Sequence, residues 1–212
     1  MNDEKEADHA QRIKHHPMTE RSPAPIRLAI LYGIIAALIR LIPFGLRPPN
    51  FAANGALGVF GGAKVPLYVI IPIQLASLAA SDYVLYRMFA WEPFNLPVYI
   101  SFVIYALLAR TLLRGRESAP RVTLVTWLGS VQFFLITNFA SWWQLSPLGS
   151  GPVLYPATLG GLMECYAQGL LFLLFTLAGD FGCTAMMFGA EAWLRAESHR
   201  TAGAEITQEA KS

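Results

Sequence analysis

Five apolar runs along this chain are each long enough to cross a lipid bilayer as a helix. They cover residues 26–43, 65–86, 97–113, 122–141 and 169–192, and a transmembrane helix needs about 17–25 mostly apolar residues. Hydrophobic residues make up 54% of the sequence and charged residues only 14%, whereas soluble domains carry about 25% charged residues. The pattern predicts an all-α integral membrane protein.

A sixth apolar segment, residues 52–63, is too short and too rich in glycine to span a bilayer as an ordinary helix. Broken segments exist at membrane depth only where protein or a water-filled cavity covers their backbone. In transporters, such interrupted segments often mark the substrate site. We therefore expect the longer helices to cover this segment, and we expect it to form one wall of a binding site.

Positive charges concentrate in the N-terminal region, in the connection after the 97–113 helix and near the C-terminus. Basic connections usually face the cytoplasm. All three regions can do so together only if the segment 52–63 also crosses. We therefore predict six transmembrane helices, the second one short or broken, with both termini cytoplasmic.

This topology also sets the expected domain boundaries. A flexible cytoplasmic tail is expected at residues 1–24, a six-helix membrane domain at 25–195 and a second flexible cytoplasmic tail at 196–212. Residues 157–168 are expected to form a short surface helix before the last span. The net charge of +2 reflects these topogenic residues and gives no indication of nucleic-acid binding.

Polar side chains from five segments reach the same outer layer of the predicted membrane domain. Counted at about 1.5 Å per helical residue from each cytoplasmic end, this layer contains Arg40, Asn50, Asn54, Asp82, Asn138 and Glu164. Charged groups inside a membrane usually face the protein interior and pair, so Arg40 is expected to pair with one of the two acids.

This polar set predicts a pocket, open to the outer face, that holds a small polar solute. Trp142, Trp143 and Tyr155 would form an aromatic lid over it. In the alternative interpretation, Arg40 reaches toward the outer headgroups and the acids only mark helix ends. That alternative does not account for the asparagines, so we favour the pocket.

Asp180 differs from this set because it lies near the middle of the last apolar run. A carboxyl group at that depth is a proton-linked site, a partner for a buried base, or neutral. We favour a structural hydrogen-bonding role, with Gln74 and Gln132 as candidate neighbours at similar depth.

The first apolar run carries small residues four positions apart, namely Ala29, Gly33 and Ala37. Such a stripe allows another helix to approach closely. It serves either packing within this chain or docking to a partner protein, and its spacing alone leaves both interpretations open.

Signals for catalysis are weak. The sequence contains no zinc-protease motif, no phosphate-binding Walker loop and no cysteine pair with metal-ligand spacing, and the histidines lie outside the apolar runs. We therefore predict neither an enzyme nor a bound cofactor or metal.

Several short motifs resemble a family of bacterial membrane proteins that are described as transport proteins without a known substrate. They include Pro49-Asn50-Phe51, Phe60-Gly61-Gly62-Ala63, Ser81-Asp82, Thr137-Asn138-Phe139 and Tyr155-Pro156. The likeness continues with Gly161-Leu162, Glu164-Cys165-Tyr166, Gly179-Asp180 and Phe188-Gly189, and covers about residues 26–190.

That family is similar to the substrate-binding S-components of energy-coupling factor (ECF) transporters. The resemblance implies a six-helix protein of the bacterial inner (plasma) membrane that holds a solute near the outer face. It also implies docking through the Ala29, Gly33 and Ala37 stripe to a transmembrane coupling subunit driven by ATPases. The rival interpretation is a membrane scaffold with the helical layout of rod-shape proteins of the MreD type, which carries no solute.

Overall fold

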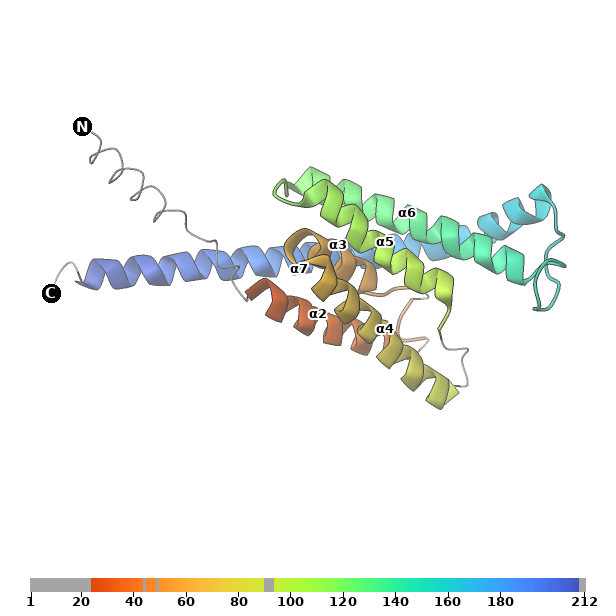
Figure 1. The fold of residues 1–212 in the computed structure, drawn as a ribbon, viewed down its shortest axis with the longest axis horizontal. Coiled ribbons are helices and arrows are strands. Elements are labelled where there is room, and N and C mark those ends of the chain that lie inside the picture. Colours follow the sequence, from red (N-terminus) through yellow and green to blue (C-terminus); the bar gives the residue numbers. More distant parts are fainter. Residues whose placement is uncertain (1–23, 44, 49, 90–93, 210–212) are drawn as a thin grey trace, which may run out of the picture.

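The computed structural model describes residues 24–43, 45–48, 50–89 and 94–209, with the backbone alone described at residues 24 and 202–209. Within these ranges the chain forms six helices and no strand (Figure 1). They are α2 (Ala24–Leu41), α3 (Asn54–Lys64), α4 (Leu67–Phe89), α5 (Leu96–Leu113), α6 (Ala119–Gln144) and α7 (Leu159–Glu209). The predicted N-terminal tail, apart from its last residue, lies outside the described residues.

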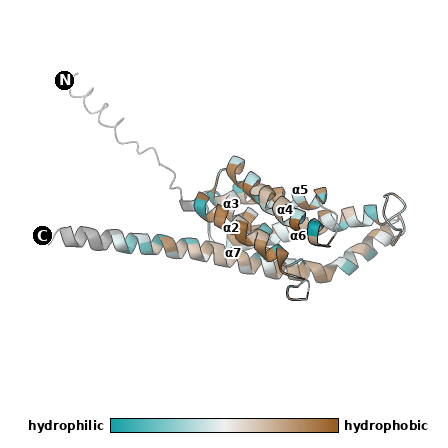
Figure 2. Ribbon diagram, turned by 90° about the horizontal axis from the view of Figure 1, so that it is seen from below, coloured by the Kyte–Doolittle hydropathy of each residue, from teal (hydrophilic) through white to brown (hydrophobic). Residues whose placement is uncertain are grey.

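Four of these helices are long and apolar enough to cross a bilayer. They are α4, α5, α6 and the part of α7 from Leu159 to Thr201. Figure 2 shows hydrophobic residues over much of the helical bundle. The chain is therefore a helical membrane protein in the part that the structure describes.

The short helix α3 lies at the centre of the bundle. Every residue from Asn54 to Ala63 is buried, and α3 packs against each of the five other helices. Its 11 residues span about 16.5 Å, roughly half of the hydrocarbon core. The prediction that this segment is covered by longer helices is confirmed, and the cover is protein on all sides.

Glycine makes this central position possible. At Gly62 an added Cβ would lie 2.2 Å from the backbone oxygen of Ala106 on α5, so the two helices are in backbone contact. At the opposite face, Phe60 makes edge-to-face contacts with Tyr32 and Phe188, with ring centroids 5.1 and 5.4 Å apart. Small residues on one side of α3 and a large aromatic on the other thus fix its place.

Helix α7 is longer than the sequence predicts. It begins at Leu159, so most of the expected surface helix is part of it, and it continues to Glu209 through most of the expected flexible C-terminal tail. No proline interrupts this stretch, and its alanines and glutamates favour helix. Its 51 residues make about 77 Å of helix, and Figure 1 shows its C-terminal part extending beyond the bundle.

Salt bridges mark one end of the bundle. Lys64, at the end of α3, pairs with Glu117 in the connection between α5 and α6 and, at 3.2 Å, with Glu191 on α7. Arg195 also pairs with Glu191. These contacts place Lys64 at the same end as the basic connection after α5, as the charge pattern predicts.

Candidate functional site

A cavity of about 250 Å³ lies near the other end of the bundle, where α2, α4, α5, α6 and α7 meet the connection between α2 and α3. Its lining includes four ionisable side chains, which are rare inside the bundle of a helical membrane protein. The lining residues are Arg40, Arg47, Asn50, Ala52, Asp82, Leu85, Asn95, Val98, Phe102, Phe133, Thr176 and Asp180.

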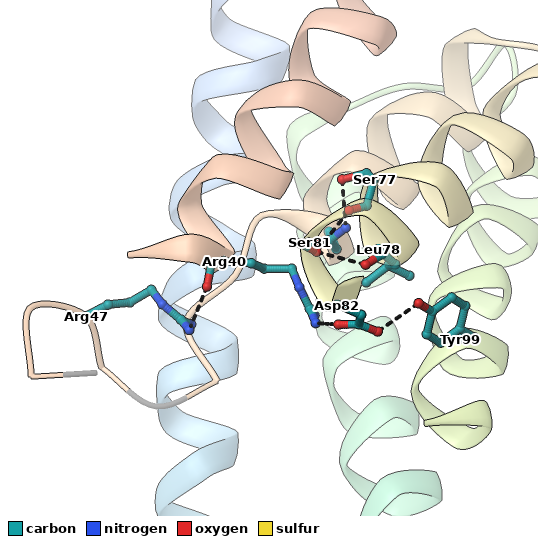
Figure 3. Close-up of polar contacts among 8 residues, drawn as sticks. Arg40, Arg47, Ser77, Leu78, Ser81, Asp82 and Tyr99 are labelled. Atoms are coloured by element: carbon teal, nitrogen blue, oxygen red, sulfur yellow. Dashed lines mark hydrogen bonds and ion pairs between the residues drawn. The ribbon is translucent and has the colours of Figure 1, made fainter. Parts of the chain in front are cut away.

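Arg40 and Asp82 form a salt bridge at this cavity, as Figure 3 shows. Their side chains are 16% and 13% exposed, so both are largely withdrawn from solvent. Arg40 stands in the last turn of α2, and the Tyr99 hydroxyl donates to the second carboxylate oxygen of Asp82 at 2.7 Å. The predicted pairing of Arg40 with an acid is confirmed, and the acid is Asp82.

Arg47 adds a second positive charge to the same end. It stands on the connection between α2 and α3, and its guanidinium donates to the Phe51 carbonyl at 2.5 Å. It also donates to the Arg40 carbonyl at 3.5 Å (Figure 3). Burial, and then the charge of Arg40, lower the pKa of Arg47 from its usual value. Arg40, Arg47 and Asp82 are thus the ionisable lining residues that the described part of the chain places at this end of the cavity.

The connection between α2 and α3 returns into the bundle before α3 begins. Asn50 adopts a left-handed backbone conformation with φ of 57°, which asparagine tolerates better than most residues. Gly179 lets α7 approach the backbone of Ala52, where a Cβ would lie 3.2 Å from the Ala52 nitrogen. This connection forms a wall of the cavity through Asn50 and Ala52. The prediction that the whole segment 52–63 forms a wall is wrong, because no residue of α3 lines the cavity.

Asp180 lines the same cavity from α7 and is only 2% exposed. Its Oδ2 accepts hydrogen bonds from the Tyr105 hydroxyl and, at 2.7 Å, from the Ser130 hydroxyl. Its carboxyl group packs against Gly55, where a Cβ would lie 2.2 Å from Oδ1. Asp180 therefore closes the end of the cavity that lies against α3.

The expected neighbours of Asp180 are wrong. Gln74 donates to the Asn54 carbonyl at 2.9 Å, and Gln132 donates to the carbonyls of Ser101 and Gly129. Each glutamine therefore donates to backbone carbonyls instead of to Asp180.

A second cavity of about 360 Å³ adjoins the first. The two share Asn50, Asn95, Val98 and Phe133 as walls. The second cavity is uncharged and polar; its other polar lining residues are Thr137, Asn138, Ser141, Tyr155 and Gln168. The Tyr155 hydroxyl donates to Gln168 at 2.9 Å, and burial raises the pKa of Tyr155, so the phenol stays neutral.

Four of the residues predicted for the pocket line neither of the two cavities. Asn54 is fully buried at the start of α3, where it donates to Ser77 at 3.4 Å. It lies deeper than predicted because the connection enters the bundle before α3 begins. Glu164 is exposed on α7, where its side chain accepts a hydrogen bond from Gln168 at 3.4 Å. Trp142 donates to the Pro156 carbonyl at 3.1 Å, and Trp143 lines a third pocket, which shares Asn95 with both cavities.

The small residues predicted as a stripe on α2 do not share one environment. Ala29 is fully buried in the core with α3, so it serves packing within the chain. Gly33 packs against Ile73 on α4, and together with Ala37 it lines an apolar groove between α2 and α4.

The sequence matches a family of unknown function, DUF6580, over residues 20–202. The chain belongs to this family. No curated protein and no solved structure matches it.

Two site residues of this DUF6580 protein escaped the sequence analysis. Arg47 was not singled out, although it stands seven residues after Arg40 in a segment expected to form the pocket wall. The predicted hydrogen-bonding role of Asp180 is confirmed by its contacts with Tyr105 and Ser130, but its place in the cavity lining was not predicted, although an acid inside a span is a signal for a functional site. In the DUF6580 chain these two residues complete a cavity with two arginines near the connection between α2 and α3 and with the carboxyl group of Asp180 against α3.

Proposed function

We propose that this chain is an inner-membrane protein that binds a small polar solute in the cavity between the Arg40–Asp82 pair and Asp180. The observation that carries this proposal is the convergence of four ionisable side chains, from α2, α4, α7 and the connection after α2, on one cavity. Charged groups inside a membrane are costly and usually mark a substrate or ion pathway. Apolar residues would fill the same space more stably if the site only held the helices together.

The size and shape of the space support a small solute. The charged cavity of about 250 Å³ is somewhat smaller than the roughly 300–1,000 Å³ that is typical of drug-sized ligand pockets. The adjoining polar cavity offers amide and hydroxyl groups to the rest of a solute, from Asn138, Tyr155 and Gln168. A solute could therefore place its charged groups in the first cavity and a neutral polar group in the second.

The orientation in the membrane follows from the charges at the opposite end. Lys64 and Arg195 cluster there with the connection after α5, which carries Arg114 and Arg116. Basic connections favour the cytoplasmic side, so the cavity would open toward the outside. This proposal includes six crossings, with α3 as the short one, and both termini in the cytoplasm.

The proposed role is that of a substrate-binding subunit similar to an ECF S-component. The sequence has no nucleotide-binding motif, so transport would require a coupling subunit with ATPases. The groove beside Gly33 and Ala37, and the exposed apolar residues Ile34 and Leu38 next to it, would form the surface for that partner. Ala29 would not belong to this surface because it is buried.

The test uses the full-length protein purified in detergent. Native mass spectrometry first looks for a co-purified small molecule, and thermal unfolding then screens amino acids, nucleosides, sugars and B vitamins for stabilisation. The decisive variant is Val98→Trp, because Val98 lines both cavities. Its matched control is Ile100→Trp, which changes an exposed aliphatic residue on the same helix.

The proposal predicts a solute that stabilises the wild type and Ile100→Trp but not Val98→Trp. If Val98→Trp binds the solute as the wild type does, the site lies elsewhere. If no molecule co-purifies and no solute stabilises the protein, solute binding is refuted. A cellular phenotype that survives Val98→Trp but not changes at the groove between α2 and α4 would favour the scaffold instead.

A further inference from the structure

A cavity at the Lys64 end of the bundle approaches the charged cavity to within one helical turn. It has a volume of about 590 Å³, and we name it the α6–α7 cavity after the two helices that supply most of its lining. Along α7, Asp180 lines the charged cavity, whereas Phe181 and Thr184 line the α6–α7 cavity. Four residues of helix correspond to about 6 Å, so a thin layer at Asp180 separates the two cavities.

Hydroxyl groups surround Asp180 in this layer. Ser130 on α6 donates to Oδ2 of Asp180 at 2.7 Å, and the Thr126 carbonyl, one turn away, is its alternative acceptor at 3.0 Å. Thr126 in turn lines the α6–α7 cavity. The Tyr105 hydroxyl donates to the same Oδ2, and the Tyr105 ring packs against Gly129. Polar groups therefore continue from one cavity to the other where α6 meets α7.

Thr184 carries a buried hydroxyl that no other described residue satisfies. Its residue is 4% exposed, its hydroxyl has no hydrogen-bond partner in the described part of the chain, and it lines the α6–α7 cavity. A threonine inside a helix can donate to the carbonyl four residues earlier, as Thr126 and Thr176 do. A buried polar group without a protein partner indicates a bound water or another small ligand, here at the level just below Asp180.

We propose that Asp180 is the relay of a proton path that runs through the bundle from the charged cavity to the α6–α7 cavity. A hydronium ion in the charged cavity gives its proton to Oδ1 of Asp180 and becomes water. The carboxyl group then gives this proton to water held at the Thr184 hydroxyl and returns to its ionised form. In each transfer one O–H bond breaks and another forms. The path uses the cavity of the proposed solute site and adds a second function to it.

The surroundings of Asp180 suit both of its protonation states. Tyr105 and Ser130 donate to Oδ2 and stabilise the ionised form. Oδ1 receives no hydrogen bond from the described residues, and it lies against Gly55 in the first turn of α3, where the helix dipole favours negative charge. Protonation breaks no salt bridge, because none joins Asp180 to a cation among the described residues.

Few other ionisable groups face Asp180. Of the helices packed against α7, α3 and α6 bring Gly55 and Ser130 to it, and neither side chain titrates. The ionisable groups around it are Tyr105 on α5, Cys183 on α7 and, across the charged cavity, Arg40 on α2, Asp82 on α4 and Arg47. Asp180 is therefore the carboxyl group that the described residues place at the boundary between the cavities, and acids inside a membrane commonly serve as proton relays.

The experiment measures proton flux into liposomes that contain the purified full-length protein. A pH-sensitive dye inside the liposomes reports acidification, and a potassium gradient with valinomycin sets an inside-negative potential. Flux is recorded without solute and then with each compound of the solute panel. We expect flux above that of protein-free liposomes. Asp180→Asn should lower it by at least about 100-fold, the lower end of what a positioned proton-transfer group contributes.

Thr184→Val separates a proton path from a merely structural role. Valine has nearly the shape of threonine but lacks the hydroxyl, and this hydroxyl has no hydrogen bond to lose among the described residues. The melting temperature should therefore stay unchanged or rise, whereas the proton flux should fall. Thr111→Val is the matched control, because Thr111 is exposed on α5 and lines neither cavity. Glu197→Gln, at an exposed position, is the control for Asp180→Asn, and both controls should conduct as the wild type does.

Three results would overturn the proton path. The first is a wild-type flux no greater than that of protein-free liposomes, both without and with solutes. The others are an Asp180→Asn or a Thr184→Val variant that conducts as well as the wild type. If Asp180→Asn does not fold, Thr184→Val decides the question. Solute binding is tested separately with Val98→Trp, so failure of one proposal is distinguishable from failure of the other.

Discussion

Replacing Gly62 by alanine sets helix propensity against packing, and the structure predicts that packing decides the result. In an isolated helix, alanine is favoured over glycine by about 1 kcal/mol. At Gly62, however, the new Cβ would lie 2.2 Å from the backbone oxygen of Ala106 and 2.9 Å from the Cβ of Ala109. A backbone oxygen cannot turn aside as a flexible side chain can.

The size of the effect follows from that distance. Real Cβ atoms essentially never approach a neighbour within 3.0 Å, so α3 and α5 must separate by about 0.8 Å, in an interior that is packed as densely as an organic crystal. Overpacking of this kind costs about 1–3 kcal/mol and occasionally more. A radial gap of about 0.5–1 Å also forfeits a quarter to a half of each affected dispersion contact. After the gain in propensity we expect a net destabilisation of about 1–3 kcal/mol.

The assay is thermal unfolding of the purified protein in detergent, with Gly182→Ala as the matched control. Gly182 also lies inside a helix, but a Cβ added there meets no atom within 4 Å. Gly182→Ala should therefore be neutral or stabilising by up to about 1 kcal/mol, and Gly62→Ala should unfold at a clearly lower temperature. Equal melting temperatures for the two variants would show that α3 and α5 are not in backbone contact, and the central place of α3 would be wrong.

Two further predictions concern the opposite end of the bundle and its orientation. Lys64→Met should destabilise the protein by about 1–3 kcal/mol in the same unfolding assay, because the Lys64 side chain is 8% exposed and Glu117 loses this partner, while Glu191 keeps Arg195. A variant as stable as the wild type would contradict the salt-bridge cluster. A membrane-impermeant maleimide added to intact spheroplasts should label Ser150→Cys but not Arg116→Cys until the membrane is broken, since both positions are exposed and the native cysteines are buried. The reverse labelling pattern would invert the proposed orientation.

The sequence predicted the helical character of this chain well because the hydrophobic pattern alone determines it. The helices α4, α5 and α6 correspond to apolar stretches of the sequence. Helices long enough to span a bilayer form there because lipid offers no hydrogen-bond partner, so the backbone groups of each span must bond to one another. The prediction that longer helices cover the segment that forms α3 is also confirmed. Its basis is that a glycine-rich segment of that length can exist in a membrane only where protein or a water-filled cavity covers its backbone. The continuous course of α7 was missed, because propensity near a chain end says little about where a helix stops.

For the candidate site, the sequence determined depth and the tertiary structure determined direction. Residue number along a helix gives height at about 1.5 Å per residue, and that was enough to bring Arg40 to the level of Asp82. The side of the helix on which a residue stands cannot be obtained in the same way, because a membrane helix is apolar both toward lipid and toward protein. Packing therefore decided that Asp180 faces the cavity and Glu164 does not, and that the connection after α2 carries Arg47 into the site while Asn54 is buried beneath it.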